Sequence, residues 1–446
     1  MKFGGLMAAV VVLAALGGGV WWSERAKKAE EGKPAKDAPP KILTIPEDQF
    51  KALRLERLNG EVTFVRKSDA GKWEIVEPKP LAADQDAVSS VISTLSSLSS
   101  DRLIEEKASD LGAFGLAKPP LQVTITKKDG KTEKVLIGDE TPTASGAFVK
   151  LASDPRVFTV GSFVKSSVDK YSKDLRDKRL LTFDSEKLTR VELQSKGVPI
   201  EFGKNNQNEW QILKPRPLRA DGSQVEELIR KLKDAKLDTT VSDEDAKKAA
   251  AAFAGGTRVA VAIVSDASGN QQLEVRKDNA KDKNYYARSS VVEGIYKVAS
   301  DLGEGLDKDI DAFRNKKVFD FGWNDPSKVE INKTVYQKSA DKWTAGSKQM
   351  DPASVQAVID KLRDLAAAKF VDNFAVQGAP VFDLVVTSGD GKRVEKVAIY
   401  KSGAVHGAKR ENEPTGYELD AKSVEELQSA VSAIKEQQPP KDQKKK

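Results

Sequence analysis

The sequence of 446 residues contains no cysteine and only one histidine, His406. Without cysteine there is no disulfide, no thiolate nucleophile or thiolate metal site, and no lipid on an amino-terminal cysteine. A single histidine excludes chemistry that needs a His pair or a Cys/His pair. The chain also lacks a Gly-rich loop ending in Gly-Lys-Ser/Thr, a Gly-x-Ser-x-Gly motif and calcium-loop carboxylates. We therefore expect no enzymatic activity, no cofactor and no metal site.

An excess of one charge is also missing. The chain has 73 basic and 67 acidic residues, and its net charge of +6 is spread along the sequence. Nucleic-acid binding would need clustered Lys and Arg, so we expect no nucleic-acid partner. The hydrophobic content of 39% with 31% charged residues fits globular domains rather than a polytopic membrane protein. The length allows about three domains.

The longest uncharged run lies at the N-terminus. Phe3 to Trp22 are 20 residues without a charge, which is enough for a helix to span a bilayer. Trp21 and Trp22 close the run, as indoles do at a membrane interface. A cleaved signal peptide is the alternative, but the apolar run continues past its run of three glycines. We predict an uncleaved anchor at residues 1–22.

The flanking charges give a mixed signal for orientation. Lys2 and the amino terminus favour a cytoplasmic N-terminus, whereas Arg25, Lys27 and Lys28 oppose it. A first helix with a short tail commonly exports the remainder of its chain, so we expect most of this chain outside the bacterial cytoplasmic membrane, in the periplasm. Residues 23–41 are rich in Lys, Glu, Ala and Pro and are predicted to be a flexible linker.

One stretch of sequence occurs three times. Each copy joins a tryptophan strand to an aspartate, and apolar residues follow at offsets of 4, 7, 8, 11 and 14 from that aspartate. These offsets mark one face of an α-helix, and the aspartate stands where an N-cap belongs. The tryptophans are Trp73, Trp210 and Trp343, and the aspartates are Asp84, Asp221 and Asp351.

The copies repeat at about 138 residues, for example from Leu53 to Val191, which is too long for a solenoid unit. Alternating strands and hairpin turns surround each helix. The sequence predicts an α+β fold of three tandem, mainly antiparallel sheet domains, each with one principal packed helix. The predicted boundaries are 42–181, 182–319 and 320–435, the last copy being shortened, with a disordered tail at 436–446.

The recurring tryptophans allow two interpretations. Trp73, Trp210 and Trp343 fill the gap between sheet and helix, or they form exposed platforms for sugar rings. Packing is the favoured interpretation, because it also explains the helix face and the cap. A Ser-rich, uncharged helix face in the first copy is a weaker candidate for protein contact.

A basic segment ends the first two copies. Arg176 and Lys178 in the first copy match Arg314 and Lys316 in the second, and each segment runs into the next copy's first strand. We favour an inter-domain joint over a contact site for anionic lipid or a partner, because the third copy lacks the segment and has no successor.

Two other features are interpreted as structural. His406 stands beside Gly407, where a lone histidine is most often a surface or turn residue, and its counterparts are Tyr285 and Ala147. The acidic run at 243–245 is predicted to open a helix, with its carboxylates at the positive end of the helix dipole.

Together, these motifs resemble a known family. A Trp-x-Ile strand, Pro-x-Pro-Leu-x-Ala-Asp, an amphipathic helix and the sequence Phe114-Gly115-Leu116 before a Pro are similar to bacterial domain-of-unknown-function family 4340. The resemblance covers nearly all of the chain after the linker and is weakest in the third copy. It implies an extracytoplasmic α+β protein, often encoded beside ABC exporter components of the gliding-motility type, with no known catalytic residues.

The sequence supports two hypotheses about function. In the first, the chain is a membrane-anchored scaffold or accessory subunit that binds an envelope protein, such as a component of an ABC transporter. In the second, it is a module that binds envelope polysaccharide or peptidoglycan through its tryptophans. An enzyme is the weakest alternative.

Overall fold

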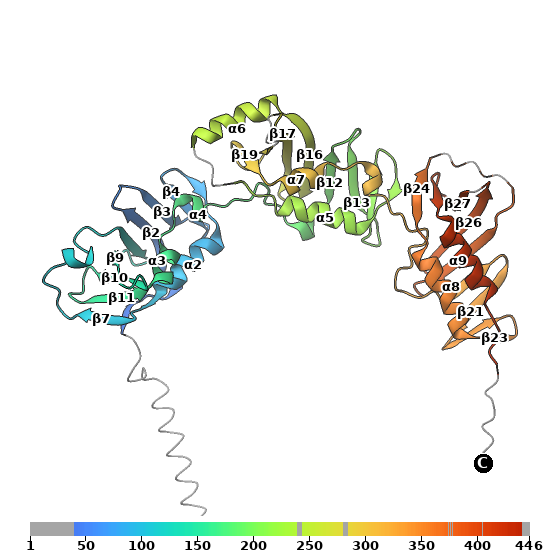
Figure 1. Ribbon diagram of the computed structural model, residues 1–446, viewed down its shortest axis with the longest axis horizontal. Helices are drawn as coiled ribbons and strands as arrows, with labels where there is room; N and C mark the ends of the chain where they lie inside the picture. Colours follow the sequence, from blue (N-terminus) through green and yellow to red (C-terminus); the bar gives the residue numbers. More distant parts are fainter. Residues whose placement is uncertain are drawn as a thin grey trace, which may run out of the picture. The chain divides into compact units, whose positions relative to one another are not determined.

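The computed structural model describes residues 40–238, 243–279, 284–372, 374, 376, 378–403 and 405–438 (Figure 1). The predicted anchor at 1–22 lies outside the described residues. Among the residues that are described, no helix is long and apolar enough to cross a membrane. The chain divides into two compact units, Met1–Lys178 and Arg179–Lys446. The predicted boundary at 319/320 falls inside the second unit.

The α+β class is confirmed, with strands that pair antiparallel throughout the described sheets. There are four sheets rather than three, because a two-stranded sheet accompanies the first large one. The three large sheets share one plan. Short strands at one edge lead into a capped helix, and a meander of longer strands follows.

The first unit contains the two-stranded sheet β1-β6 and the nine-stranded sheet β5-β4-β3-β2-β8-β9-β10-β11-β7. Its strands are β1 (Lys41–Thr44), β2 (Phe50–Arg57), β3 (Val62–Lys67), β4 (Trp73–Glu77), β5 (Leu81–Ala82), β6 (Ser97–Ser99), β7 (Arg102–Glu105), β8 (Leu121–Lys127), β9 (Thr132–Glu140), β10 (Gly146–Leu151) and β11 (Val157–Gly161). Its helices are η1 (Glu47–Gln49), α2 (Gln85–Ser96), η2 (Gly112–Phe114), α3 (Ser162–Val168) and α4 (Ser172–Leu175).

The second unit contains two large sheets, and the first of these has the order β15-β14-β13-β12-β16-β17-β18-β19. Its strands are β12 (Arg190–Gln194), β13 (Ile200–Lys204), β14 (Trp210–Lys214), β15 (Leu218–Arg219), β16 (Thr257–Asp266), β17 (Gly269–Lys277), β18 (Tyr285–Ser289) and β19 (Ile295–Val298). Its helices are η3 (Ser185–Lys187), α5 (Gly222–Lys233), α6 (Asp243–Gly255), α7 (Ser300–Leu306) and η4 (Ile310–Ala312).

The last large sheet has the order β23-β22-β21-β20-β25-β26-β27-β28-β24. Its strands are β20 (Lys328–Ile331), β21 (Thr334–Ser339), β22 (Lys342–Ala345), β23 (Lys348–Met350), β24 (Ala367–Val371), β25 (Phe382–Ser388), β26 (Arg393–Ser402), β27 (Val405–Arg410) and β28 (Gly416–Leu419). Its helices are α8 (Pro352–Asp364) and α9 (Ala421–Ser432).

The predicted helix caps are confirmed. Asp84 accepts hydrogen bonds from the first free backbone N–H groups of α2, and Asp221 and Asp351 do the same for α5 and α8, at 3.0 to 3.3 Å. These bonds satisfy donors that a helix start leaves unpaired. The apolar residues at offsets 4, 7, 8 and 11 are buried in all three helices.

The helices are shorter than the apolar pattern suggests. Leu98, Ala235 and Leu365, at offset 14, lie beyond the helix ends but are still buried. The residue at this offset is therefore buried in the core although it lies in the segment that follows the helix. Further helices accompany the principal ones, since α3, α7 and α9 pack beside α2, α5 and α8 (Figure 1). Of these, the sequence predicts α9, as a helix over 423–434.

Two predicted termini need correction. Lys41 belongs to β1 and not to the linker. Glu436, predicted to start a disordered tail, forms a bridge with Met350, and the Asp351 N–H donates to the Lys435 carbonyl at 2.9 Å. The first two copies close in the same way at Asp84 and Asp221. The side chains of Lys348 and Glu436 form an ion pair at this edge.

A phenylalanine packs on the sheet face opposite α2 or α8. In the first sheet Phe114 meets Phe148 edge to face, with ring centroids 5.0 Å apart. In the last sheet Gly407 stands at the counterpart of Phe148, and a Cβ there would lie 2.2 Å from the Phe374 ring. In the last sheet, the Phe374 ring packed on a glycine therefore occupies the place that two aromatic rings occupy in the first sheet.

We predict that Asp221→Ala lowers the free energy of unfolding by about 1 kcal/mol, because two N–H groups of α5 lose their acceptor. Asp221→Asn keeps an acceptor oxygen and should cost only a few tenths of a kcal/mol. Urea unfolding of both variants measures the difference. Equal losses in the two variants would contradict the capping role.

Candidate functional site

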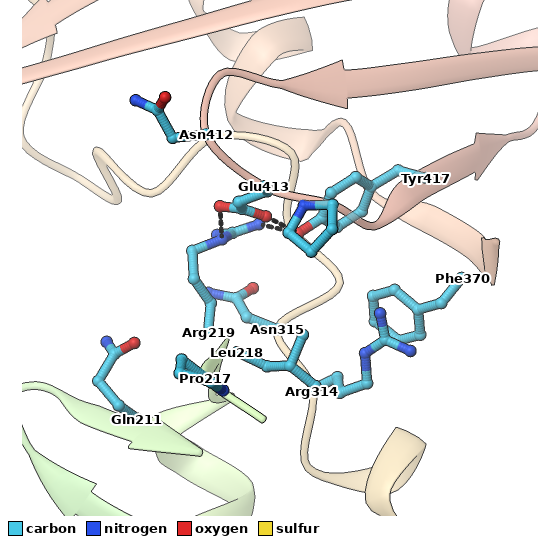
Figure 2. Close-up of a pocket in the computed structure, with 11 residues that line it drawn as sticks. Gln211, Pro217, Leu218, Arg219, Arg314, Asn315, Phe370, Asn412, Glu413 and Tyr417 are labelled. Atoms are coloured by element: carbon cyan, nitrogen blue, oxygen red, sulfur yellow. Dashed lines mark hydrogen bonds and ion pairs between the residues drawn. The ribbon is translucent and has the colours of Figure 1, made fainter. Parts of the chain in front are cut away.

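A cavity of about 200 Å³ lies inside the second unit, where the β15 edge of one sheet meets the β27–β28 turn of the next (Figure 2). Its walls come from both sheets and from the chain that connects them. The residues that line it are Gln211, Pro217, Leu218, Arg219, Arg314, Asn315, Phe370, Asn412, Glu413, Pro414 and Tyr417.

Backbone pairing places this connection. Arg219 ends the two-residue edge strand β15 and pairs with Gln211 of β14. The connection then runs along the same edge, and the Asn315 N–H donates to the Arg219 carbonyl at 3.0 Å. Three residues later the Val318 N–H donates to the Leu365 carbonyl, at the end of α8. The connecting chain is therefore hydrogen-bonded to both sheets it joins.

The guanidinium of Arg219 is the centre of the site. It forms an ion pair with Asp320, and its Nε lies 3.0 Å from Glu413 Oε1. One Nη2 N–H group donates to Tyr417 Oη at 2.9 Å and another to the Lys317 carbonyl at 2.6 Å. Tyr417 in turn donates to Glu413 at 2.5 Å. Arg219 comes from one sheet, whereas Glu413 and Tyr417 come from the other.

A second arginine extends this network into the last sheet. Arg410 pairs with Glu413 at 2.7 Å and with Glu395 at 3.0 Å. Glu395 is buried and accepts from the Asp320 N–H at 2.8 Å. Partly buried carboxylates and guanidinium groups thus alternate around buried Glu395, and this satisfies charges that would be costly to bury alone.

Arg314 forms a second contact between the sheets. Its guanidinium carbon lies 3.7 Å from the centre of the Phe370 ring, a close cation–π arrangement that Figure 2 shows. It also donates to Thr415 at 3.0 Å and pairs with Asp311 at 2.9 Å. Phe370 and Thr415 belong to the last sheet, so Arg314 attaches the connecting chain to it.

The electrostatics of the site stabilise the charged arginine. Burial by itself would lower the pKa of Arg219, but Asp320, Tyr417 and Glu413 outweigh it and raise that pKa above its usual value. Burial raises the pKa of the Tyr417 phenol, and nearby Glu413 raises it further while Arg219 lowers it. The Arg219 cation and the neutral Tyr417 phenol are therefore the forms that belong to the folded state.

The arrangement suits a joint better than a reaction centre. The cavity is smaller than a typical ligand pocket of about 300 Å³ or more. Arg219, Arg314 and Glu413, which line it, all have partners within the unit. In the part of the chain that the structure describes, no group of three or more His, Asp or Glu residues could hold a metal ion.

The first sheet has a matching turn with different contents. Asp154-Pro155-Arg156 corresponds to Glu413-Pro414-Thr415, and Phe158 takes the place of Tyr417. Arg156 pairs with Asp154 at 2.7 Å and lies 5.1 Å from the centre of the Phe158 ring. In the first sheet, the arginine that pairs with the acidic residue of the turn therefore lies in the same turn.

Sequence reasoning found only part of this joint. Arg314 belongs to this joint. The Lys316 carbonyl accepts a hydrogen bond from the Ala367 N–H at 2.7 Å, whereas the Lys316 side chain is exposed. Arg176 forms a bridge with Ala83 in the first unit, and Lys178 is the last residue of that unit. Arg219 was missed, because its counterpart in the first copy is Ala82 and only the second copy carries the signal.

The other candidate residues lie away from the cavity. Trp73, Trp210 and Trp343 are buried, one in each hydrophobic core, so their rings offer no platform for a sugar. The prediction for His406 was wrong, because it lies buried in β27 and not in a surface turn. The acidic run at 243–245 opens α6, as predicted.

Comparison with protein-family models identifies a family. The model of the family described as "Domain of unknown function (DUF4340)" matches residues 73–250 and again 210–380. Each match begins at a strand tryptophan and includes a connection between copies, 176–183 in the first and 314–321 in the second. No curated protein matches the chain.

We predict that Arg219→Met destabilises the second unit by roughly 3 kcal/mol, because it leaves Asp320 and Glu413 without their shared cation. Both carboxylates are 23% exposed, which places the loss at the low end for a broken buried pair. Arg230→Met on the exposed surface of α5 is the matched control and should change stability by less than about 0.5 kcal/mol. Similar urea midpoints for the two variants would contradict the role of Arg219.

The raised pKa of Tyr417 gives a second prediction. Its contribution to stability is fully present below the ordinary tyrosine pKa of 10.0 and is lost as the pH rises through the higher value in the folded state. The stability advantage of the wild type over Tyr417→Phe should therefore shrink above pH 10. An advantage that stays constant through this range would show that the hydroxyl does not remain protonated in the folded chain.

Proposed function

The chain belongs to the DUF4340 family, and from this premise we propose that it is a non-catalytic scaffold anchored in the bacterial cytoplasmic membrane. In this proposal most of the chain lies on the periplasmic side and serves as an accessory subunit of an ABC-type transport or gliding-motility-like envelope complex. The Arg219 network carries the proposal. Its charged side chains join two sheets. A scaffold that holds a partner in place needs such connections between its parts.

Two further observations support a scaffold. The family match includes both connections between copies, so each matched region extends beyond a single sheet. The 20 uncharged residues from Phe3 to Trp22 supply a membrane anchor in sequence. An anchored chain of linked sheets can hold an envelope partner at a fixed place without chemistry of its own.

Polysaccharide binding is the second candidate, and one observation favours it. Trp323 is 90% exposed, with the Arg363 guanidinium carbon 5.2 Å from the centre of its ring. An exposed indole beside a cation can stack on a sugar ring. The core tryptophans add nothing to such a site, so among the described tryptophans Trp323 is the one available to a sugar.

We predict that the full-length chain stays in the membrane fraction after alkaline carbonate washing. Crosslinking on native membranes followed by mass spectrometry should then identify membrane subunits of a transporter. Release by carbonate would contradict anchorage, and capture without any transport protein would contradict the accessory role. Retention on peptidoglycan that Trp323→Ala abolishes would favour the second candidate instead.

A further inference from the structure

Two exposed apolar side chains distinguish the first unit. Leu58, after β2, is 65% exposed, and Phe163, on α3, is 68% exposed. Among the described residues of this unit, these two are the large apolar side chains that stand clearly in solvent. Exposed apolar side chains grouped together commonly mark a contact surface.

Strand pairing places both residues at the same end of the sheet. Arg57, next to Leu58, pairs with Leu121 at the start of β8, and Leu121 pairs with Ile137 near the end of β9. From there the Glu140–Gly146 loop leads to β10, whose first residue pairs with Gly161. Phe163 comes two residues later. The ends of β2, β9 and β11 thus share one end of the sheet.

An ion pair ties the two positions together. Arg57 is buried, and its Nη2 lies 2.8 Å from Asp169 Oδ1, at the residue that ends α3. Phe163 lies six residues before Asp169 on this helix, about 9 Å along its axis. The hairpin that carries Leu58 is therefore tied to the far end of the helix that begins beside Phe163.

The N-terminal segment enters the sheet at this same end. The backbone N–H and the hydroxyl of Ser100 both donate to the Pro40 carbonyl, at 3.0 and 2.8 Å. The next residue, Asp101, donates its N–H to the Thr159 carbonyl at 2.8 Å, two residues before Gly161. The chain that carries the uncharged run Phe3–Trp22 thus reaches the fold close to Phe163.

Both other sheets carry a charge at the position of Phe163, and the second sheet carries one at the position of Leu58. Phe163 is the second residue of α3, and the second residues of α7 and α9 are Asp301 and Lys422. The counterpart of Leu58, 138 positions later, is Lys196. Packing in this fold therefore does not require an apolar residue at either position, and contact with something outside the fold would account for both.

The surroundings favour an apolar partner and not an ionic one. The adjoining loop at 141–145 is exposed or half-buried and has no charged residue. Nearby Lys165 is paired with Glu140 at 3.2 Å, and exposed Arg102 stands next to exposed Asp101. Attraction to anionic headgroups would need an unbalanced basic patch, which these residues do not supply.

We propose that Leu58 and Phe163 dock the first unit on the surface of the lipid bilayer, with both side chains inserted between headgroups and acyl chains. This inference rests on the proposed membrane anchor. The sequence places 17 residues, 23–39, between the uncharged run and the first described residue. The anchor thus keeps the surface at a high local concentration near the membrane, so two apolar side chains suffice for docking.

The absence of cysteine makes the test direct. Ser162→Cys places a single thiol on α3 beside Phe163, and Ser300→Cys places one at the counterpart on α7. Each full-length variant carries a nitroxide label and is reconstituted in phosphatidylcholine vesicles. The label at 162 should become more accessible to oxygen and less accessible to a water-soluble nickel complex than the label at 300. Raising the salt concentration should not reverse this difference.

The charged counterparts supply the matched substitutions. Phe163→Asp with Leu58→Lys introduces residues that the second sheet carries at these positions, and the label at 162 should then lose its protection from the nickel complex. Vesicle flotation of the same samples reports anchorage separately. If the labelled Ser162→Cys and Ser300→Cys chains float and the label at 162 is as exposed as that at 300, docking is overturned and the scaffold proposal stands. Failure to float would instead overturn the anchor. Protection that appears only in native membranes would mean that a protein partner covers this surface, which also overturns lipid docking.

Discussion

The second unit depends on one buried cation. Arg219 has a side chain only 13% exposed, and it is bonded to a carboxylate on the connecting chain and to a carboxylate and a phenol on the next sheet. A guanidinium loses much of its hydration when buried and recovers that energy only where several acceptors are already in place. Arg219 therefore stabilises one relative position of the two sheets and makes other positions less stable. Hydrophobic packing, which has no direction, could not specify this position so narrowly.

Local structure could be predicted closely from the sequence. The aspartate caps, the apolar helix faces and the hairpin turns depend on residues near one another in the chain, and repetition in three copies made each signal clear. The short helices α3 and α7 were missed, because seven residues show too little periodicity to stand out. The joint was missed for a different reason. Arg219 and Tyr417 are 198 positions apart, and no local pattern links them.

Comparison of the copies shows which positions keep the same kind of residue in the three sheets and which positions differ. Buried positions keep their character, as the three core tryptophans do, whereas positions at the sheet ends change freely. Phe163, Asp301 and Lys422 hold the same helical position with an apolar, an acidic and a basic side chain. A fold that tolerates all three lets each copy acquire its own contacts without losing its core. Differences between copies are therefore a better guide to specificity here than the features that the copies share.

The self-paired turn of the first sheet has a consequence for assembly. An interface that joins the edge of one sheet to the turn of the next uses two different surfaces, and such contacts can continue from molecule to molecule into fibres. In the first sheet Arg156 already neutralises Asp154, and at the far edge of the last sheet Lys348 is paired with Glu436. At both places an acidic and a basic side chain are already paired within the chain, which weakens their attraction for the charges of a neighbouring molecule.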